Sequence, residues 1–258
     1  MDFNGKKYQH SKMHTGIKSQ IISLSRADPL HEVCGFIYRD WNGGPQILPC
    51  QNVATDPTEE FEISIDDSIR VQGLGRALAV YHSHPSASPG FSPADLECAE
   101  EMALPFYLYD VETETWHEYI PKSYESEFLG RQWCVGFDDC YSVPRNYFRK
   151  IHGIYLRDYD RDESMSHEER GVIAHSYERE GFSVVPKETI QEGDVLVFKT
   201  DKALPQHFGV YAKGNQFIHH PINGLSRLEP FSERWFSRLI SVFRHKSMVK
   251  SAQNPCNP

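Results

Sequence analysis

Apolar residues in the first half of the chain recur at two spacings, which together predict an α/β domain. Helical spacing covers three segments, 11–26, 69–74 and 92–103. Apolar or alternating runs that predict strands cover 32–38, 46–53, 61–65, 77–81, 105–111 and 116–120, the last two as a hairpin. Strands and helices mixed in this order predict a mixed sheet with flanking helices.

The second half of the chain has its predicted elements in a different order. Two helices come first, over 140–151 and 166–180, and four strand candidates follow, at 194–199, 207–212, 216–219 and 238–243. Helices followed by a small antiparallel sheet predict an α+β domain. A polar segment, 121–127, separates the halves. We therefore expect one domain over residues 1–122, a second over 123–250 and a disordered tail over 251–258.

The composition argues against several classes of function. The chain has 258 residues, 39% of them hydrophobic, and its formal net charge of −9 argues against nucleic acid as a partner. No apolar run approaches the roughly 20 residues that span a bilayer, and the N-terminus lacks the apolar core of a signal peptide. We therefore expect no membrane span and synthesis in the cytosol. Six scattered cysteines without C-x-x-C spacing indicate neither a disulfide framework nor a structural zinc site of that type.

Two histidines, His82 and His84, follow the apolar run 77–81 and lie two residues apart. On a strand, residues i and i+2 share one face, so both imidazoles are able to reach one ion. Eleven residues after His84, Asp95 places a carboxylate near the start of the predicted helix 92–103. Two imidazoles and one carboxylate with an open fourth position are typical of a catalytic Zn2+ site.

A catalytic zinc also needs a general base and a group that supports the developing oxyanion. Glu32 stands at the start of a run that should be buried, where a carboxylate is costly without a task or a partner, and it is the candidate base. Ser92 is the candidate donor to the oxyanion. A second interpretation is open, because Ser92, Pro93 and Asp95 also make a common helix start with serine as N-cap.

Together these residues resemble the JAMM, or MPN+, metalloprotease family. The family's pattern is an upstream Glu, then His-x-His-Pro, six residues, Ser, two residues and Asp. The chain supplies each of these positions, with Glu32, His82, His84, Pro85, Ser92 and Asp95. The resemblance implies a peptide or isopeptide hydrolase whose zinc ligands are His82, His84 and Asp95. Glu32 would then be the general base and Ser92 the oxyanion support.

A second candidate site lies in the other half of the chain. Cys140 precedes a predicted amphipathic helix, whose N-terminal dipole favours a thiolate. A thiolate needs a histidine to activate it and a polar group to orient that histidine. His207 begins one predicted strand and His219 ends the next, so a hairpin would make them neighbours and allow a triad with Cys140. The alternative is that Cys140 is a buried core thiol and both histidines are surface residues of the hairpin.

This order and spacing resemble the NlpC/P60 family of papain-like cysteine peptidases. The segments that carry the resemblance are 139–140, 193–196, 207–211 and 217–219. The resemblance implies Cys140 as nucleophile, His207 as general base and His219 as the third, orienting member. Two positions depart from the family's pattern. Tyr141 stands where serine usually follows the cysteine, and Trp133 stands where the family has a tyrosine before it.

A JAMM domain followed by an NlpC/P60 domain resembles the lambda-like tail tip assembly proteins of long-tailed bacteriophages. The resemblance implies a protein that is made in the host cytoplasm and has other tail tip proteins as partners. If it stays in the finished particle, it is located at the virion tail tip. It implies cleavage of peptidoglycan stem peptides by the second half and of a peptide or isopeptide bond by the first. Two other interpretations stay open. One is an assembly component with one or both sites vestigial, and the other is a cellular deubiquitinase-like enzyme, which accounts for the first half only.

Overall fold

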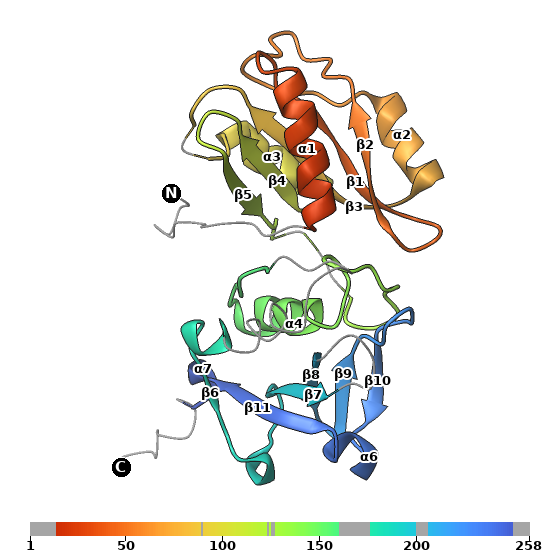
Figure 1. The fold of residues 1–258 in the computed structure, drawn as a ribbon, viewed down its shortest axis with the longest axis vertical. Coiled ribbons are helices and arrows are strands. Elements are labelled where there is room, and N and C mark those ends of the chain that lie inside the picture. The colour runs from red at the N-terminus through yellow and green to blue at the C-terminus, as the bar shows by residue number, and fades with distance from the viewer. Residues whose placement is uncertain are drawn as a thin grey trace. The chain divides into compact units, whose positions relative to one another are not determined.

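The structure is a computed structural model that describes residues 14–88, 90–122, 124, 127–159, 176–199 and 206–249. Most of the predicted helix 166–180 and all of the predicted tail 251–258 lie outside these residues. Contacts divide the chain into two units, the first made mainly by residues up to 126 and the second mainly by residues from 127 onward. Each unit has its own sheet (Figure 1). Among the residues described, no helix is both long enough and apolar enough to cross a membrane.

The first unit is built on a five-stranded sheet in the order β2-β1-β3-β4-β5. The strands are β1 (Cys34–Asp40), β2 (Pro45–Cys50), β3 (Gly75–His84), β4 (Phe106–Asp110) and β5 (Thr115–Tyr119). β3 runs parallel to β4, and every other neighbouring pair is antiparallel. The sheet is therefore mixed, as the sequence predicts, and β4 and β5 form the predicted hairpin.

Three helices pack on this sheet: α1 (Thr15–Ala27), α2 (Ile65–Leu74) and α3 (Pro93–Met102). α1 contributes Ile17 and Ile21 to a core that includes Ala79 and Tyr81 of β3. Val80, the residue between these two, belongs to a second core together with buried residues of α2 and α3. Because alternate residues of a strand point to opposite faces, helices cover both faces of the sheet. This is the α/β arrangement.

The predicted strand 61–65 is wrong. Ile63 makes only an isolated bridge, and α2 begins at Ile65, earlier than the predicted short helix. The reason is Ser64, whose hydroxyl accepts the backbone N–H of Asp67 and so caps the helix. The apolar alternation over 61–65 therefore ends in a helix start, where capping decides the backbone conformation.

The second unit is built on a six-stranded antiparallel sheet in the order β10-β9-β8-β7-β11-β6. Its strands are β6 (Phe182–Val184), β7 (Val195–Lys199), β8 (Gln206–Ala212), β9 (Gln216–His219), β10 (Arg227–Pro230) and β11 (Leu239–His245). Its described helical elements are α4 (Ser142–His152), η1 (Lys187–Thr189), α6 (Glu233–Phe236) and α7 (Lys246–Val249), together with a helical turn at 176–179. All four predicted strands are present. β6 and β10 are additional. β6 has only three residues, and β10 (Arg227–Pro230) is mostly exposed and has a single apolar side chain apart from its proline, so neither shows a periodicity.

Apolar side chains line both faces of the second sheet. Tyr141, directly before α4, contacts Phe208 of β8, with 5.6 Å between ring centroids. Phe198 of β7 pairs with His207 of β8, so the two side chains share a face of the sheet. His207 precedes Phe208 on β8, and Phe198 therefore lies on the face opposite Phe208. There it packs with Trp235 of α6. The residue before α4 thus packs on one face of the sheet, and α6 packs on the other.

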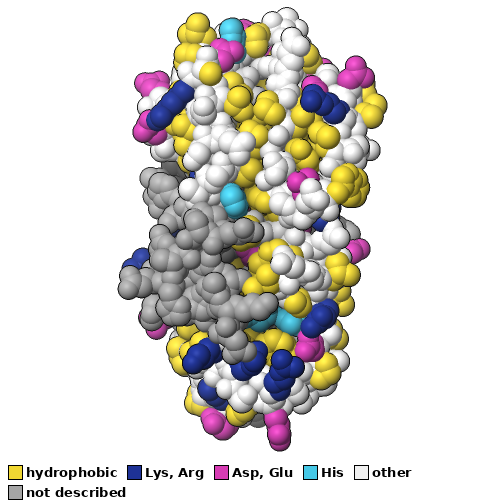
Figure 2. All heavy atoms as spheres, turned by 45° about the vertical axis from the view of Figure 1, so that its right-hand side comes forward, with side chains coloured by type: hydrophobic (Ala, Val, Ile, Leu, Met, Phe, Trp, Pro, Cys, Tyr) yellow, Lys and Arg dark blue, Asp and Glu magenta, His cyan; other side chains and the backbone are white. Residues whose placement is uncertain are grey.

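Some apolar side chains remain exposed on each unit. Ile65 and Ile69 of α2 are 79% and 61% exposed, and Leu228 and Phe236 of the second unit are 40% and 45% exposed. Figure 2 shows apolar side chains scattered among polar ones on one face of the molecule. Scattered exposure of this kind is normal for a folded surface.

Gly35 of β1 provides a test of how tightly the first sheet is packed. A Cβ added at Gly35 would lie 2.3 Å from the backbone oxygen of Leu48 and 2.7 Å from the hydroxyl of Tyr81, so Gly35→Ala must displace backbone. We expect Gly35→Ala to lower the free energy of unfolding by about 1–3 kcal/mol, measured by urea denaturation. Gly73→Ala is the matched control, because a Cβ there meets nothing within 4 Å. Inside α2 it should be neutral or stabilise by up to about 1 kcal/mol. If Gly35→Ala were as stable as Gly73→Ala, the close packing of β1 between its neighbours would be refuted.

Candidate metal centre and thiol site

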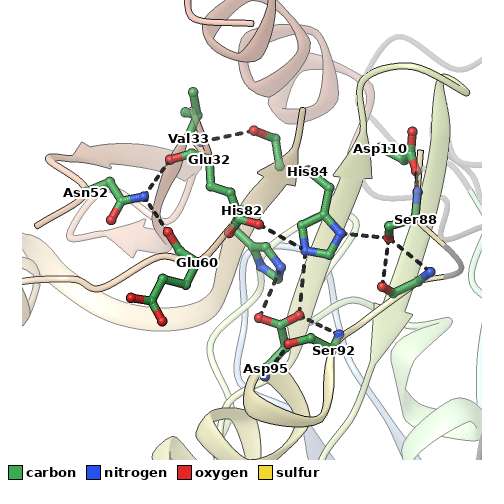
Figure 3. A network of polar contacts seen from close by, with 12 residues as sticks. Glu32, Val33, Asn52, Glu60, His82, His84, Ser88, Ser92, Asp95 and Asp110 are labelled. Atoms are coloured by element: carbon green, nitrogen blue, oxygen red, sulfur yellow. Dashed lines mark hydrogen bonds and ion pairs between the residues drawn. The ribbon is translucent and has the colours of Figure 1, made fainter. Parts of the chain in front are cut away.

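The first candidate site gathers at the end of β3. His82 and His84 are two residues apart on this strand and so lie on one face of the sheet. Their ring centroids are 5.1 Å apart, and His82 is fully buried. His82 also stacks on Phe61, with 4.5 Å between ring centroids. Figure 3 shows both imidazoles turned toward the carboxylate of Asp95.

Asp95 reaches the two imidazoles from the first turn of α3. One carboxylate oxygen lies 3.4 Å from Nε2 of His82, and the other lies 3.7 Å from Nε2 of His84. The same carboxylate accepts the backbone N–H of Ser92 at 2.7 Å, and the hydroxyl of Ser92 accepts the backbone N–H of Asp95 at 3.1 Å. This reciprocal capping box is the helix start that the sequence left open as an alternative. It also aims the carboxylate at the histidines, so the capping and metal-binding interpretations are compatible.

Glu32 contacts His84 from the segment that precedes β1. It is only 4% exposed, and one of its carboxylate oxygens lies 3.4 Å from Nε2 of His84. Its other oxygen has no hydrogen-bond partner in the part of the chain that the structure describes. Burial raises the pKa of Glu32 to about 7, despite the opposing effect of His84. A carboxyl group that exchanges its proton near neutral pH suits a general base.

The four side chains fit a divalent metal ion better than they fit one another. Hydrogen bonds between nitrogen and oxygen are about 2.7–3.2 Å long, whereas the separations in this cluster are 3.4 and 3.7 Å. Ligand atoms about 2.0–2.1 Å from a tetrahedral zinc ion lie about 3.3–3.4 Å from one another. Burial lowers the pKa of His82, so its imidazole is neutral, and its Nε2 has no hydrogen-bond partner among the described residues. The ligand atoms of Glu32, His82 and His84 all lie within 4.8 Å of one another, a grouping that is able to hold a metal ion. This group has Glu32 in place of Asp95, the third ligand that the JAMM resemblance implies.

The orientation of His84 is determined from the far side of its ring. Nδ1 of His84 lies 2.7 Å from Oγ of Ser88, and that hydroxyl donates its hydrogen to the carbonyl of Gly90 at 2.9 Å (Figure 3). The hydroxyl oxygen therefore accepts from Nδ1, so that in the neutral imidazole the lone pair is on Nε2, the atom that faces the carboxylates. Asp110 holds Ser88 by accepting its backbone N–H at 2.8 Å. The sequence analysis missed Ser88 because the contact depends on the path of the loop after Pro85.

The second candidate site begins at Cys140, which is buried and stands two residues before α4. The contact between Tyr141 and Phe208 places the start of α4 against β8. Cys140 and His207 are each one residue away from this contact, and His207, which alternates with Phe208 on β8, lies on the face of the sheet that carries Trp235. The structure thus brings together the two elements that carry the thiol and the base, whereas the pairing of Cys140 with His207 stays a prediction.

His207 and His219 lie side by side, as expected from the hairpin of β8 and β9. Nε2 of His207 is 2.8 Å from Nδ1 of His219, and both side chains are buried. Nε2 of His219 lies 3.0 Å from a carboxylate oxygen of Glu229 on β10. The sequence does not indicate Glu229, because β10 has no apolar alternation and Glu229 belongs to no motif.

The two departures from the NlpC/P60 pattern pack into the second unit. Tyr141 is fully buried, and its hydroxyl donates to a backbone carbonyl at 2.9 Å. Trp133 lies edge-on against His220, with 5.4 Å between ring centroids. His220 follows His219 but contacts a different part of the fold, since its Nε2 donates to the carbonyl of Gly224 at 3.2 Å. Burial lowers the pKa of His220 to about 4.

Comparisons with known proteins match the two halves of the chain separately. Residues 14–122 match the family model for prokaryotic homologs of the JAB domain, and residues 128–244 match that of the NlpC/P60 family. The tail tip assembly protein K of Escherichia phage N15 is 28% identical over 88% of this chain and 93% of its own length. The protein of the same name from Escherichia phage lambda is 28% identical over 74% of this chain and 92% of its own length. The chain is therefore similar to phage tail tip assembly proteins and has both domains in the order that the sequence analysis predicts.

His220 makes the stability of the second unit depend on pH. Burial lowers its pKa from 6.5 to about 4, so between these values the unfolded chain binds a proton that the folded chain does not. Stability is therefore lost as the pH falls from about 6.5 toward 4. His220→Gln keeps an N–H donor for the carbonyl of Gly224. We expect it to reduce the loss of unfolding free energy between about pH 7 and pH 5 by about 1 kcal/mol, measured by urea denaturation. His31→Gln, at a surface position, is the control. A pH dependence of His220→Gln equal to that of the wild type would contradict this assignment.

Proposed function

We propose that this chain, a JAB-type domain followed by an NlpC/P60-type domain in a relative of phage tail tip assembly proteins, is a peptidase with two active sites. The NlpC/P60 family is a family of peptidases. The observation that carries the proposal is the buried cluster of two acids and two imidazoles, Glu32, His82, His84 and Asp95. Burying such groups is costly unless they bind a cation, so the cluster favours a functional site.

In the first half of the chain, His82, His84 and Asp95 would hold a zinc ion, because Asp95 lies against both imidazoles. Bound there, zinc would supply a Lewis acid that polarises the carbonyl of a peptide or isopeptide bond. Glu32, buried beside His84, would take a proton from the attacking water and return it to the leaving amine. The capping box uses the hydroxyl of Ser92 as an acceptor, so its hydrogen is left to donate to the oxyanion.

In the second half, Cys140 would be the nucleophile and His207 its general base. Transfer of the thiol proton to His207 produces a thiolate, which attacks the carbonyl carbon of a peptide bond. The imidazolium returns the proton to the leaving amine, and water then hydrolyses the thioester. The positive end of α4, which begins two residues after Cys140, would stabilise the thiolate. His219 would orient His207 through their hydrogen bond.

The similar proteins suggest where these reactions take place, because both are named for tail tip assembly. We infer that the chain acts with other tail tip proteins, in the host cytoplasm during assembly or at the virion tail tip. Its second site would cut peptidoglycan stem peptides and so help the tail to cross the cell wall. Its first site would cut a peptide or isopeptide bond in a tail protein.

A role in assembly without catalysis is the second candidate for the NlpC/P60-type half. Tyr141 and Trp133 favour it, since both differ from the NlpC/P60 pattern and both pack into the fold. Cys140 would then be a core thiol, which agrees with its burial. Digestion of cell-wall material distinguishes the two roles.

Zinc content tests the first site. We expect the full-length chain to bind about one zinc ion per molecule, measured by metal analysis after reconstitution, and His82→Ala to lose it. Ser88→Ala should weaken zinc affinity by about 10–100-fold, because it removes the partner that orients His84. Glu32→Gln should keep the metal, since Glu32 is proposed as base and not as ligand.

His31→Ala, which removes a surface histidine, is the control for these zinc measurements. Equal zinc content in the wild type and in His82→Ala would refute the metal centre. Loss of zinc in Glu32→Gln, together with retention in Asp95→Asn, would reverse the roles of the two acids.

Purified peptidoglycan sacculi test the second site. We expect the wild-type chain to release peptide fragments, identified by mass spectrometry, and Cys140→Ala to release them at least about 1,000-fold more slowly. Glu32→Gln should digest sacculi like the wild type, because its defect lies in the other half. Cys98→Ala controls for the loss of a thiol elsewhere. Digestion by Cys140→Ala at the wild-type rate, or none by the wild type, would favour the assembly role.

A further inference from the structure

The hydrogen bonds of the second site continue past His219 to a carboxylate. Nε2 of His207 lies 2.8 Å from Nδ1 of His219, and Nε2 of His219 lies 3.0 Å from Oε2 of Glu229. Arg227 of β10 is the register partner of His219, and Glu229 is two residues further along the same strand. Glu229 is therefore a diagonal neighbour of His219, within reach of a long side chain. Three side chains from three adjacent strands form one chain of hydrogen bonds.

Two further donors hold Glu229 as an anion. Arg227 donates to Oε2 of Glu229 from Nε at 2.9 Å and from Nη2 at 2.8 Å. Trp235 donates from its indole nitrogen to Oε1 at 2.8 Å. Although burial opposes ionisation, the contacts with Trp235, Arg227 and His219 lower the pKa of Glu229 to about 2. At neutral pH the carboxylate is therefore ionised, and it can only accept hydrogen bonds.

An ionised carboxylate determines which nitrogens of the two histidines carry hydrogen. Because Glu229 accepts, Nε2 of His219 must donate to it. Burial lowers the pKa of both His207 and His219, so each imidazole is neutral and has one N–H. Nδ1 of His219 is then an acceptor, and Nε2 of His207 must donate to it. Nδ1 of His207 is left without hydrogen, and it is the atom that can take a proton from a thiol.

We propose that Glu229 is a fourth member of the second site, a positioning residue that acts through His219 to keep Nδ1 of His207 free to accept a proton. The inference rests on the proposed role of His207 as the base for Cys140. When the thiol proton moves to Nδ1, an S–H bond breaks and an N–H bond forms, while Nε2 of His207 keeps its hydrogen bond to His219. No proton has to reach Glu229.

The direction of the hydrogen bonds matters more here than net charge. Arg227 offsets the charge of Glu229, and His220, whose pKa burial lowers, adds no charge near His207 at neutral pH. Removal of the carboxylate would leave the Arg227 guanidinium as the neighbour of Nε2 of His219. A guanidinium only donates, so it would favour the opposite tautomer in both histidines.

Nuclear magnetic resonance of the full-length chain, with isotope labels in the histidine ring nitrogens, tests the tautomers directly. Protonated and unprotonated ring nitrogens differ in chemical shift, and His207→Ala and His219→Ala identify the signals. We expect hydrogen on Nε2 of both histidines in the wild type, and a population with hydrogen on Nδ1 of both in Glu229→Ala. Hydrogen on Nδ1 but not on Nε2 of His207 in the wild type, or wild-type tautomers in Glu229→Ala, would overturn the inference. This measurement needs no catalysis, so it is independent of the proposed function.

The rate at which iodoacetamide alkylates Cys140 gives a second measurement, taken as a pH profile. We expect Glu229→Ala to slow alkylation by about 10–100-fold at neutral pH and to move the profile to higher pH. Glu233→Ala removes an exposed carboxylate at the start of α6 and should leave the rate unchanged. Trp235→Phe removes one donor to Glu229 but keeps the carboxylate against His219, so it should slow alkylation less than Glu229→Ala.

Failure of this inference and failure of the proposed function give different results. Equal losses of rate in Trp235→Phe and Glu229→Ala would make Glu229 only an anchor of α6, and the inference would be wrong. Alkylation of wild-type Cys140 no faster than in His207→Ala would instead refute the thiol site of the proposed function. In that case the tautomers of the wild type still decide whether Glu229 orients His219.

Discussion

The removal of ionisable side chains from water is the constraint on which both candidate sites depend. A buried carboxylate or imidazole loses its hydration and destabilises the fold unless another group replaces the water. In the first unit, His82 and Asp95 face each other at 3.4 Å, too far for a good hydrogen bond and close to the spacing of metal ligands. In the second unit, His207 and His219 satisfy each other at 2.8 Å, and the series ends at an ionised carboxylate. The separations in the first cluster suit ligands of a cation, whereas the second cluster is already linked as a chain of hydrogen bonds.

In each site, a residue behind the histidine decides what its reactive nitrogen does. A neutral imidazole has one N–H, so the partner of one ring nitrogen determines the state of the other. Ser88 accepts from Nδ1 of His84, so that the neutral ring has its lone pair on Nε2. Glu229 has the corresponding effect on His207, but it acts through His219, which lies between them. The two units have unrelated sheets, yet each controls proton positions from the far side of the ring.

The start of α3 shows that capping and chemistry can share side chains. The sequence left two interpretations of Ser92 and Asp95 open, and the structure makes both contacts with one carboxylate. At the start of α2, by contrast, a capping residue makes the prediction from apolar alternation wrong. There Ser64 turns an alternating apolar run into the beginning of a helix, so the predicted strand 61–65 does not form. Alternation over five residues is a weaker signal than a cap that satisfies a backbone donor.

The sequence by itself determined the order of an α/β unit and an α+β unit, and it determined that His82 and His84 share a strand face. These features follow from periodicity and capping, which act over a few neighbouring residues. Only the tertiary structure decided that Ser88 lies behind His84 and Glu229 behind His219. Those contacts depend on the path of a loop and on the register of β10, a mostly exposed strand without apolar alternation. The hydrogen-bond partner of a buried side chain is whichever group packing brings against it, and no local pattern of residues encodes that choice.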